Sequence, residues 1–280
     1  MRVVGSGGKR EGRGAWRGRQ KRGANKELTT AATHRRRRSY NGTTWLNDFH
    51  EYSLDLNRWR EIDAQGEKPA PRFGYVSVVH ADAFILFGGY DGSTWLNDTW
   101  SFDFGTQTWE EIEPTGDVPS IRSCPSWTKH ESSVFVFGGY DGMQRMNDFF
   151  EYNCEEQEWT EILGTGTKPS PRYFHSCAIH QTRLYVFGGY NGTERLNDMH
   201  QYDFETNVWG SVECKGAVPS GRSSLVMEVA GNSMLVFGGY NGRRVLNDFY
   251  EFKFQVFTAL RLCLSASFPL FLFSKASCLI

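Results

Sequence analysis

The side chains best suited to metal chemistry are three histidines that stand 50 residues apart: His80, His130 and His180. Imidazole is the commonest metal ligand in proteins, so three histidines suggest a metal site. Because the interval is fixed, however, the three histidines occupy the same position in successive repeat units. Such positions are spread through a fold rather than gathered at one point. His50 and His200 repeat in the same way, and His175 stands alone. The pattern favours structural roles, and we expect no metal and no cofactor.

Paired carboxylates are a second candidate, because two acids can share the general acid and base roles of hydrolysis. Glu110-Glu111 and Glu155-Glu156 are such pairs, but they fall in or beside an expected outer strand, where a solvated surface is the better interpretation. The chain has no Gly-x-Ser-x-Gly elbow and no phosphate-binding loop. Its six cysteines form no Cys-x-x-Cys pair, which argues against structural zinc. We therefore predict a protein that is not an enzyme.

These residues belong to a repeat with a period of 50 residues. A Gly-Gly-Tyr-Asp/Asn-Gly motif begins at Gly88, Gly138, Gly188 and Gly238, and a remnant, Tyr40-Asn41-Gly42, lies one period earlier. An Asn-Asp pair recurs at 47–48, 97–98, 147–148, 197–198 and 247–248. Tryptophan recurs at Trp59, Trp109, Trp159 and Trp209, and a Pro-x-x-Arg motif ends at Arg72, Arg122, Arg172 and Arg222. Agreement across so many columns indicates repeated structural units.

Each unit predicts four short strands separated by turn residues: Tyr75–Val79, Phe84–Phe87, Thr99–Phe104 and Thr108–Ile112. Four strands in a repeat of this length are typical of a β-propeller blade. We expect the two glycines to adopt positive φ where chains approach closely, and the tryptophan to pack between blades. We expect the Asn-Asp pair to bond its own loop backbone. The predicted fold is therefore an all-β propeller.

The order of these features resembles the kelch repeat over residues 40–255: an apolar strand with Gly-Gly, a loop, Leu-Asn-Asp, an aromatic strand and a spaced tryptophan. The motif wording is most similar to the kelch regions of leucine-zipper-like transcriptional regulator proteins and Rab9-effector-type proteins. The resemblance implies a protein-binding adaptor, such as a substrate receptor of a cullin-3 ubiquitin ligase. No BTB or BACK region, through which such receptors contact the cullin, stands in this chain. The alternatives are a propeller enzyme of the oxidase or epimerase type and a cytoskeletal, actin-binding scaffold.

Two loop sets vary between units, namely the residues after each Gly-Gly-Tyr-x-Gly and those after each Pro-x-x-Arg. The resemblance implies that both sets open on one face and contact peptide ligands. Aromatic and arginine side chains on a rigid scaffold are the usual anchors of protein interfaces, and arginine binds carboxylates in two-point contacts. The periodic arginines could instead brace their own turns. The candidate partner-binding residues are Trp45, Arg72, Tyr90, Trp95, Arg122, Tyr140, Arg145, Arg172, Tyr173, Tyr190, Arg195, Arg222, Tyr240 and Arg243.

The two ends of the chain differ from the repeat. Two strands precede three full units and three strands follow them, so we expect about four blades of a partial propeller, with further blades or domains in the full-length protein. Residues 1–39 hold 13 of the 31 Lys/Arg and read as a disordered or non-native leader. Residues 256–280 read as a non-native or disordered tail, whose apolar run is interrupted by Pro269 and is shorter than the ~18 residues of a membrane span.

Charge narrows the choice of partner and of compartment. The repeat carries 16 Lys/Arg against 30 Asp/Glu, which disfavours nucleic acid binding through the propeller. We expect another protein as partner, bound through acidic segments. The cysteine pattern favours a reducing compartment, so we expect a cytoplasmic protein, or a nuclear one if the basic leader is native.

Overall fold

The computed structural model describes residues 46–254, and the regular elements in this range are all β-strands. No helix with the length and apolar character of a membrane span is found between residues 46 and 254. The leader, the tail and Trp45 lie outside the described residues.

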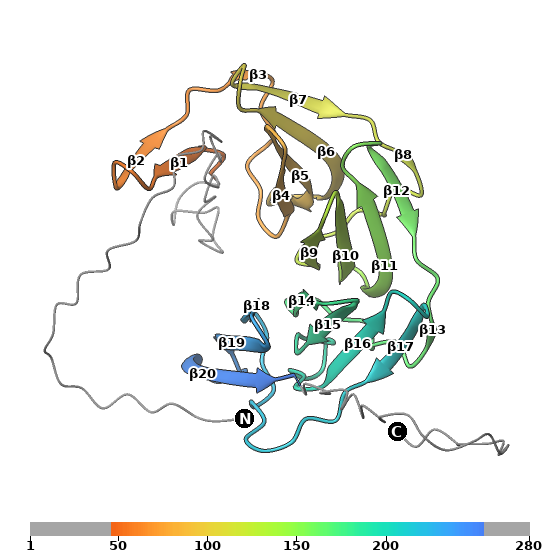
Figure 1. Ribbon diagram of the computed structural model, residues 1–280. Helices are drawn as coiled ribbons and strands as arrows, with labels where there is room; N and C mark the ends of the chain where they lie inside the picture. The colour runs from red at the N-terminus through yellow and green to blue at the C-terminus, as the bar shows by residue number, and fades with distance from the viewer. Residues whose placement is uncertain (1–45, 255–280) are drawn as a thin grey trace, which may run out of the picture.

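The strands form five sheets, in which the longer strands pair antiparallel and which we number in chain order (Figure 1). Sheet 1 contains β1 (His50–Ser53) and β2 (Arg58–Glu61). Sheet 2 contains β4 (Val76–His80), β5 (Ala83–Tyr90), β6 (Trp95–Asp103) and β7 (Thr108–Ile112). Sheet 3 contains β9 (Ser126–His130), β10 (Ser133–Tyr140), β11 (Arg145–Asn153) and β12 (Glu158–Glu161).

The later sheets repeat this order. Sheet 4 contains β14 (Ser176–His180), β15 (Arg183–Phe187), β16 (Met199–Asp203) and β17 (Val208–Ser211). Sheet 5 contains β18 (Val226–Ala230), β19 (Ser233–Tyr240) and β20 (Val245–Lys253). Three two-residue strands pair in parallel with the outer strands of sheets 2 to 4: β3 (Gln65–Gly66), β8 (Thr115–Gly116) and β13 (Thr165–Gly166).

The sheets stand side by side in an arc, as in a propeller (Figure 1). The first strands of neighbouring sheets, β4, β9, β14 and β18, contact one another in that order along the inner side of the arc. The strands β7, β12 and β17 lie on its outer side. The all-β propeller blades expected from the 50-residue period are therefore confirmed.

The two glycines of the motif bend the second strand in sheets 2, 3 and 5, where the strand pairing shifts as expected. Gly88 and Gly89 have φ of 64° and 109°, and the register of β5 on β6 shifts between Phe87 and Gly89. A Cβ on Gly89 would lie 3.0 Å from the carbonyl oxygen of Phe73, so the backbone of the preceding connection leaves no room for a side chain. Beyond this bulge the pairing resumes and continues to Tyr90.

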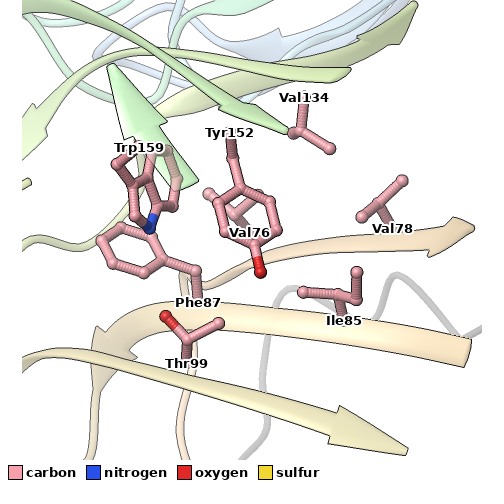
Figure 2. A pocket seen from close by; sticks show the side chains of 8 residues that line it. All are labelled: Val76, Val78, Ile85, Phe87, Thr99, Val134, Tyr152 and Trp159. Atoms are coloured by element: carbon pink, nitrogen blue, oxygen red, sulfur yellow. The ribbon is translucent and has the colours of Figure 1, made fainter. Parts of the chain in front are cut away.

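The core lies in the seams between sheets, and the periodic tryptophans are central to it. Trp159 packs with Val76, Val78, Ile85 and Phe87 of sheet 2, and Trp109 and Trp209 fill the equivalent places in the two flanking seams. Figure 2 shows the side chains around Trp159, which enclose a cavity of only ≈ 10 Å³. The expectation that tryptophan packs between blades is confirmed.

The Asn-Asp pairs do not bond their own loop as expected. Asn97 Nδ2 donates to the carbonyl of Pro119, 3.3 Å away in the connection that leads into sheet 3. Its equivalents do the same, in the pairs Asn47–Pro69, Asn147–Pro169 and Asn197–Pro219. The Pro-x-x-Arg arginines donate to the aspartates 26 residues later, namely Asp98, Asp148, Asp198 and Asp248, whereas Asp48 pairs with His50. The pair thus holds two long-range connections, which residue type alone does not reveal.

Candidate functional site

The turn after each di-glycine and the connection after each Pro-x-x-Arg lie side by side. Antiparallel bridges join them in the pairs Phe73–Tyr90, Ser123–Tyr140, Tyr173–Tyr190 and Ser223–Tyr240. The first three turns are also tied to the next sheet, because Gly89 N–H donates to the carbonyl of Arg122 at 2.9 Å, and Gly139 and Gly189 repeat this bond. We call the surface formed by residues 88–95, 138–145, 188–195, 238–245 and the connections beside them the loop face.

The turns of the loop face are fixed by their own Asp or Asn side chains. Asp91 Oδ1 accepts hydrogen bonds from the backbone N–H groups of Ser93 and Thr94, each at 2.7 Å. The bond from Thr94 is the main reason that the pKa of the exposed Asp91 carboxyl falls to about 2. Asn191 makes the equivalent bonds at 2.9 Å without a charge. The turns are therefore preformed, whichever of the two residues they carry.

The four periodic arginines are not on the surface. Arg172 binds both carboxylate oxygens of Asp198 at 2.7 and 2.8 Å, and it also donates to the carbonyls of Gly188 and Ser170. The same contacts recur at the other three positions, in the pairs Arg72–Asp98, Arg122–Asp148 and Arg222–Asp248. All four arginines are at most 3% exposed. The expectation that the loop face displays Arg72, Arg122, Arg172 and Arg222 is therefore corrected, since their donors are already used within the sheet.

The electrostatics of these pairs follow from their partners. Burial alone would raise the pKa of the Asp198 carboxyl, but hydrogen bonds from His200 and Arg172 hold that pKa well below its usual range. Hydrogen bonding by Arg222 likewise lowers the pKa of Asp248. Both carboxylates remain ionised at neutral pH, so each buried guanidinium keeps its counter-charge.

A second column of side chains does lie on the loop face. The residue five positions after each tyrosine is its cross-strand neighbour, in the pairs Tyr90–Trp95, Tyr140–Arg145, Tyr190–Arg195 and Tyr240–Val245. The first three of these neighbours reach across the seam to the glycine of the next turn, where a Cβ would meet them at 2.4, 2.8 and 3.1 Å. We call Trp95, Arg145 and Arg195 the bridging residues.

The bridging residues join the tyrosines into a continuous row of rings and cations. Trp95 lies 4.5 Å from the Tyr90 ring and 5.8 Å from the Tyr140 ring, and its indole N–H donates to Ser123 at 3.1 Å. The Arg145 guanidinium lies 5.0 Å from the Tyr140 ring and 6.0 Å from that of Tyr173. These separations are those of cation–π contacts.

The last bridging residue, Arg195, lies closer to its two rings than Arg145 does. The Arg195 guanidinium lies 4.8 Å from the Tyr190 ring and 4.6 Å from that of Tyr240, so it is held between two sheets. Among residues 46–254, neither Arg145 nor Arg195 has a carboxylate within 4.0 Å. The loop face therefore carries two positive charges that are positioned by aromatic rings and not neutralised by an ion pair.

The four tyrosines are held by their hydroxyl groups. Each hydroxyl donates to the carbonyl of the glycine two residues later, at 2.8 Å for Tyr90 and 2.6 Å for Tyr190. Burial raises the pKa of the Tyr173 hydroxyl, and the neighbouring Arg145 charge opposes that rise. The rings are thus rigid, half-buried surfaces that lose little entropy when a ligand covers them.

An open hollow of ≈ 510 Å³ lies beside Arg195 at the seam of sheets 4 and 5. It is lined by Thr193, Glu194, Arg195, Ser220, Gly221, Asn241, Gly242 and Arg243. Met143, on the turn of sheet 3, is 89% exposed. Met143, Thr193 and Glu194 belong to loop segments that vary between units, so sequence variation already marked their positions, although it did not show that some of them line a hollow.

The structure thus divides the candidate residues into groups. Tyr90, Trp95, Tyr140, Arg145, Tyr173, Tyr190, Arg195, Tyr240 and Arg243 share the loop face, whereas the four Pro-x-x-Arg arginines are buried behind it. Sequence reasoning did not select Phe73, which packs on Tyr90, or Ser123, the acceptor for Trp95. No group of three or more His, Cys, Asp or Glu residues suited to a metal is present in the described part of the chain.

A family model described as the KLHDC2/KLHL20/DRC7 Kelch-repeats domain matches residues 38–131 and 125–270. The chain belongs to this kelch-repeat family. Kelch-repeat domains are generally protein-binding modules.

Two curated relatives, both from Arabidopsis thaliana, match a single stretch of the kelch chain. Acyl-CoA-binding domain-containing protein 4 is 51% identical over 45 residues, and acyl-CoA-binding domain-containing protein 5 is 49% identical over 45 residues. Each match covers 16% of this chain and 7% of the relative. Such a stretch is shorter than one 50-residue unit and shows similarity of the repeat alone.

Proposed function

We propose that this kelch chain is a non-enzymatic adaptor that binds a partner protein through the loop face. The observation that carries the proposal is the pair Arg145 and Arg195, which stack on tyrosine rings and have no carboxylate partner among the described residues. Rigid aromatic rings beside arginine are the usual composition of an interface hot spot. An acidic segment of a partner would supply the missing counter-charges.

Other features support a protein partner. Residues 39–255 carry 30 Asp/Glu against 16 Lys/Arg, and this net negative charge would repel a nucleic acid backbone. His175, whose pKa is lowered by burial, lies in a seam between sheets rather than in a hollow where a substrate would react. We propose a cytoplasmic location, in keeping with a cysteine pattern that contains no Cys-x-x-Cys pair.

The test is to remove the bridging residues together. A Trp95→Ala, Arg145→Ala, Arg195→Ala triple variant is expected to lose at least tenfold in affinity for partners recovered with the parent chain, because it loses one anchor ring and both ring-stacked cations. The control variant Arg58→Ala, Lys129→Ala, Arg183→Ala changes exposed cations at strand ends remote from the loop face. Affinity purification followed by quantitative mass spectrometry measures both. Retention of every partner by the bridging-residue variant would contradict the proposal.

We propose further that the bound protein is a substrate of a cullin-3 ubiquitin ligase. The support is the similarity of the Gly-Gly-Tyr-Asp/Asn-Gly and Leu-Asn-Asp motifs to leucine-zipper-like transcriptional regulator and Rab9-effector-type kelch proteins. Partners that the parent chain captures and the triple variant does not should accumulate when cullin-3 is depleted. Unchanged half-lives of these partners would separate the ligase assignment from the binding role.

A further inference from the structure

The bridging residues change in character along the arc. Trp95 stands between sheets 2 and 3, Arg145 between sheets 3 and 4, and Arg195 between sheets 4 and 5. One end of the row is therefore aromatic and the rest is cationic. Met143, 89% exposed on the turn beside Trp95, adds apolar surface at the aromatic end.

The charges of the turns change in the same direction. The motif position after tyrosine is Asp91 in sheet 2 and Asp141 in sheet 3, but it is the neutral Asn191 and Asn241 in sheets 4 and 5. Arg243 lines the hollow beside Arg195. The potential of the loop face thus becomes more positive from sheet 2 towards sheet 5.

The surroundings of Arg145 and Arg195 favour an anionic ligand over water. Their Nε atoms are buried and have no hydrogen-bond partner among the described residues. A cation that is partly removed from water and lacks an ion-pair partner costs free energy, which a carboxylate ligand would offset. The guanidinium faces lie on tyrosine rings, the Nε–H groups are buried, and Arg145 also forms a side-chain hydrogen bond with Tyr173, so the remaining terminal N–H groups are the ones left for such a ligand.

From these gradients we propose that the loop face binds an extended segment of its partner in one direction only. This inference rests on the proposed function. An aromatic or large apolar side chain of the segment lies on Trp95 and Met143. One carboxylate pairs with Arg145, and a second enters the hollow and pairs with Arg195 and Arg243. Glu194 on the rim of the hollow disfavours further acidic residues, so the ligand is an apolar-to-acidic segment rather than a polyacidic one.

The order can be tested with defined peptides. The probes are fluorescein-labelled peptides that carry one Phe and two Glu, separated by Gly-Ser spacers of several lengths and written in both orders. Matched peptides replace Glu by Gln or Phe by Ser. Fluorescence anisotropy on the full chain is expected to show one order binding about tenfold more tightly than its reverse, and the Gln peptides losing about tenfold, as for one charge-assisted contact.

A swapped variant makes the test specific for the row. The double variant Trp95→Arg, Arg195→Trp exchanges the aromatic end and the cationic end of the row. The two positions are equivalent, because each side chain faces a glycine of the next turn. This variant is expected to prefer the reverse peptide order. Arg195→Gln alone should remove the preference for Glu over Gln at only one of the two acidic positions of the peptide. The control Arg183→Gln should leave the preference at both positions unchanged. Circular dichroism melting verifies that each variant is folded.

Each outcome decides between the two proposals. Tight binding that does not depend on peptide order, or a swapped variant that keeps the parent's preference, overturns the directional inference and leaves partner binding intact. Absence of binding by every peptide at millimolar concentration, together with full partner retention by the bridging-residue triple variant, overturns both.

Discussion

At the scale of one residue, His175 shows that burial in a seam between sheets keeps an imidazole neutral. Its side chain is 5% exposed, its Nε2 donates to the Phe137 carbonyl at 3.1 Å, and its ring stands edge-on to the Phe137 ring. Burial, helped by the charge of Arg172, lowers the pKa of His175 from 6.5 to about 3. The folded protein therefore keeps this imidazole neutral at pH values where the unfolded chain protonates it.

The consequence is a loss of stability in mild acid. Above pH 6.5 the histidine is neutral in both states, and below it only the unfolded chain binds the proton until the pH approaches 3. His175→Leu adopts the residue found at the equivalent buried position, Leu225, and removes this dependence. Between pH 7 and pH 5 the parent should lose about 2 kcal/mol more unfolding free energy than the variant. Urea unfolding at several pH values measures this, with exposed His130→Gln as control; parallel pH curves for the parent and His175→Leu would contradict it.

Sequence reasoning reached some of these residues and not others. The positions of Trp95, Arg145 and Arg195 were predictable because they differ between units while their neighbours repeat. The burial of Arg72 and its three equivalents was not, because a period shows that a residue recurs but not whether it faces solvent. Their carboxylate partners stand 26 residues later in the chain, and only the folded sheet brings the two together.

At the scale of the element, sheets 2 to 5 are each held by a buried arginine that pairs with a partly exposed aspartate in or just before the third strand. The Asp198 side chain is 40% exposed and keeps a hydrogen bond with His200, so losing Arg172 removes a charge-assisted contact worth about 1.5–3 kcal/mol rather than leaving a buried charge alone. Arg172→Gln should therefore lower the free energy of unfolding by about that amount. Arg183→Gln, which breaks an exposed pair with Asp203, should cost at most about 1 kcal/mol.

Denaturant unfolding of both variants, followed by tryptophan fluorescence, measures the difference. Trp209 in the adjoining seam is a suitable reporter, since it is 1% exposed and packs on Phe137 and Phe149. Equal effects of the two substitutions would show that the Arg172–Asp198 pair does not hold the sheet. Asp198→Asn provides a second route to the same pair, because it removes the carboxylate and keeps the size of the side chain.

The strands themselves were largely predictable. The fourth strand, Thr108–Ile112, has the predicted bounds, because Thr and Trp favour strands and turn residues flank them. The second and third strands extend further than expected, to Tyr90 and from Trp95, because pairing resumes beyond the glycine bulge. Hydrophobic patterning does not show this extension, since it lies on the loop face and carries polar residues.

At the scale of the whole molecule, the same seam recurs between neighbouring sheets along the arc. Sheet 5 has the same apolar face as the earlier sheets, but no further sheet covers it among the described residues. Phe137 and Phe149 of sheet 3 are both 0% exposed, because Trp209 of sheet 4 packs on them at 5.2 and 5.4 Å. Their equivalents in sheet 5, Phe237 and Phe249, are 48% and 44% exposed. Among the described residues, β20 also pairs only with β19, so apolar side chains and an open strand edge occur together.

Such a surface favours association between copies of the chain. The Phe237→Gln, Phe249→Gln double variant is therefore expected to shift the onset of concentration-dependent association to at least several-fold higher protein concentration, with little change in melting temperature. The matched variant Phe137→Gln, Phe149→Gln should lower the melting temperature strongly, because it places polar groups without partners in a closed seam and costs several kcal/mol, about 3–5 for each lost aromatic ring. Sedimentation velocity and thermal melting measure the two effects. If the double variant of sheet 5 associates as readily as the parent, the exposed phenylalanines are covered in solution and another surface holds the copies together.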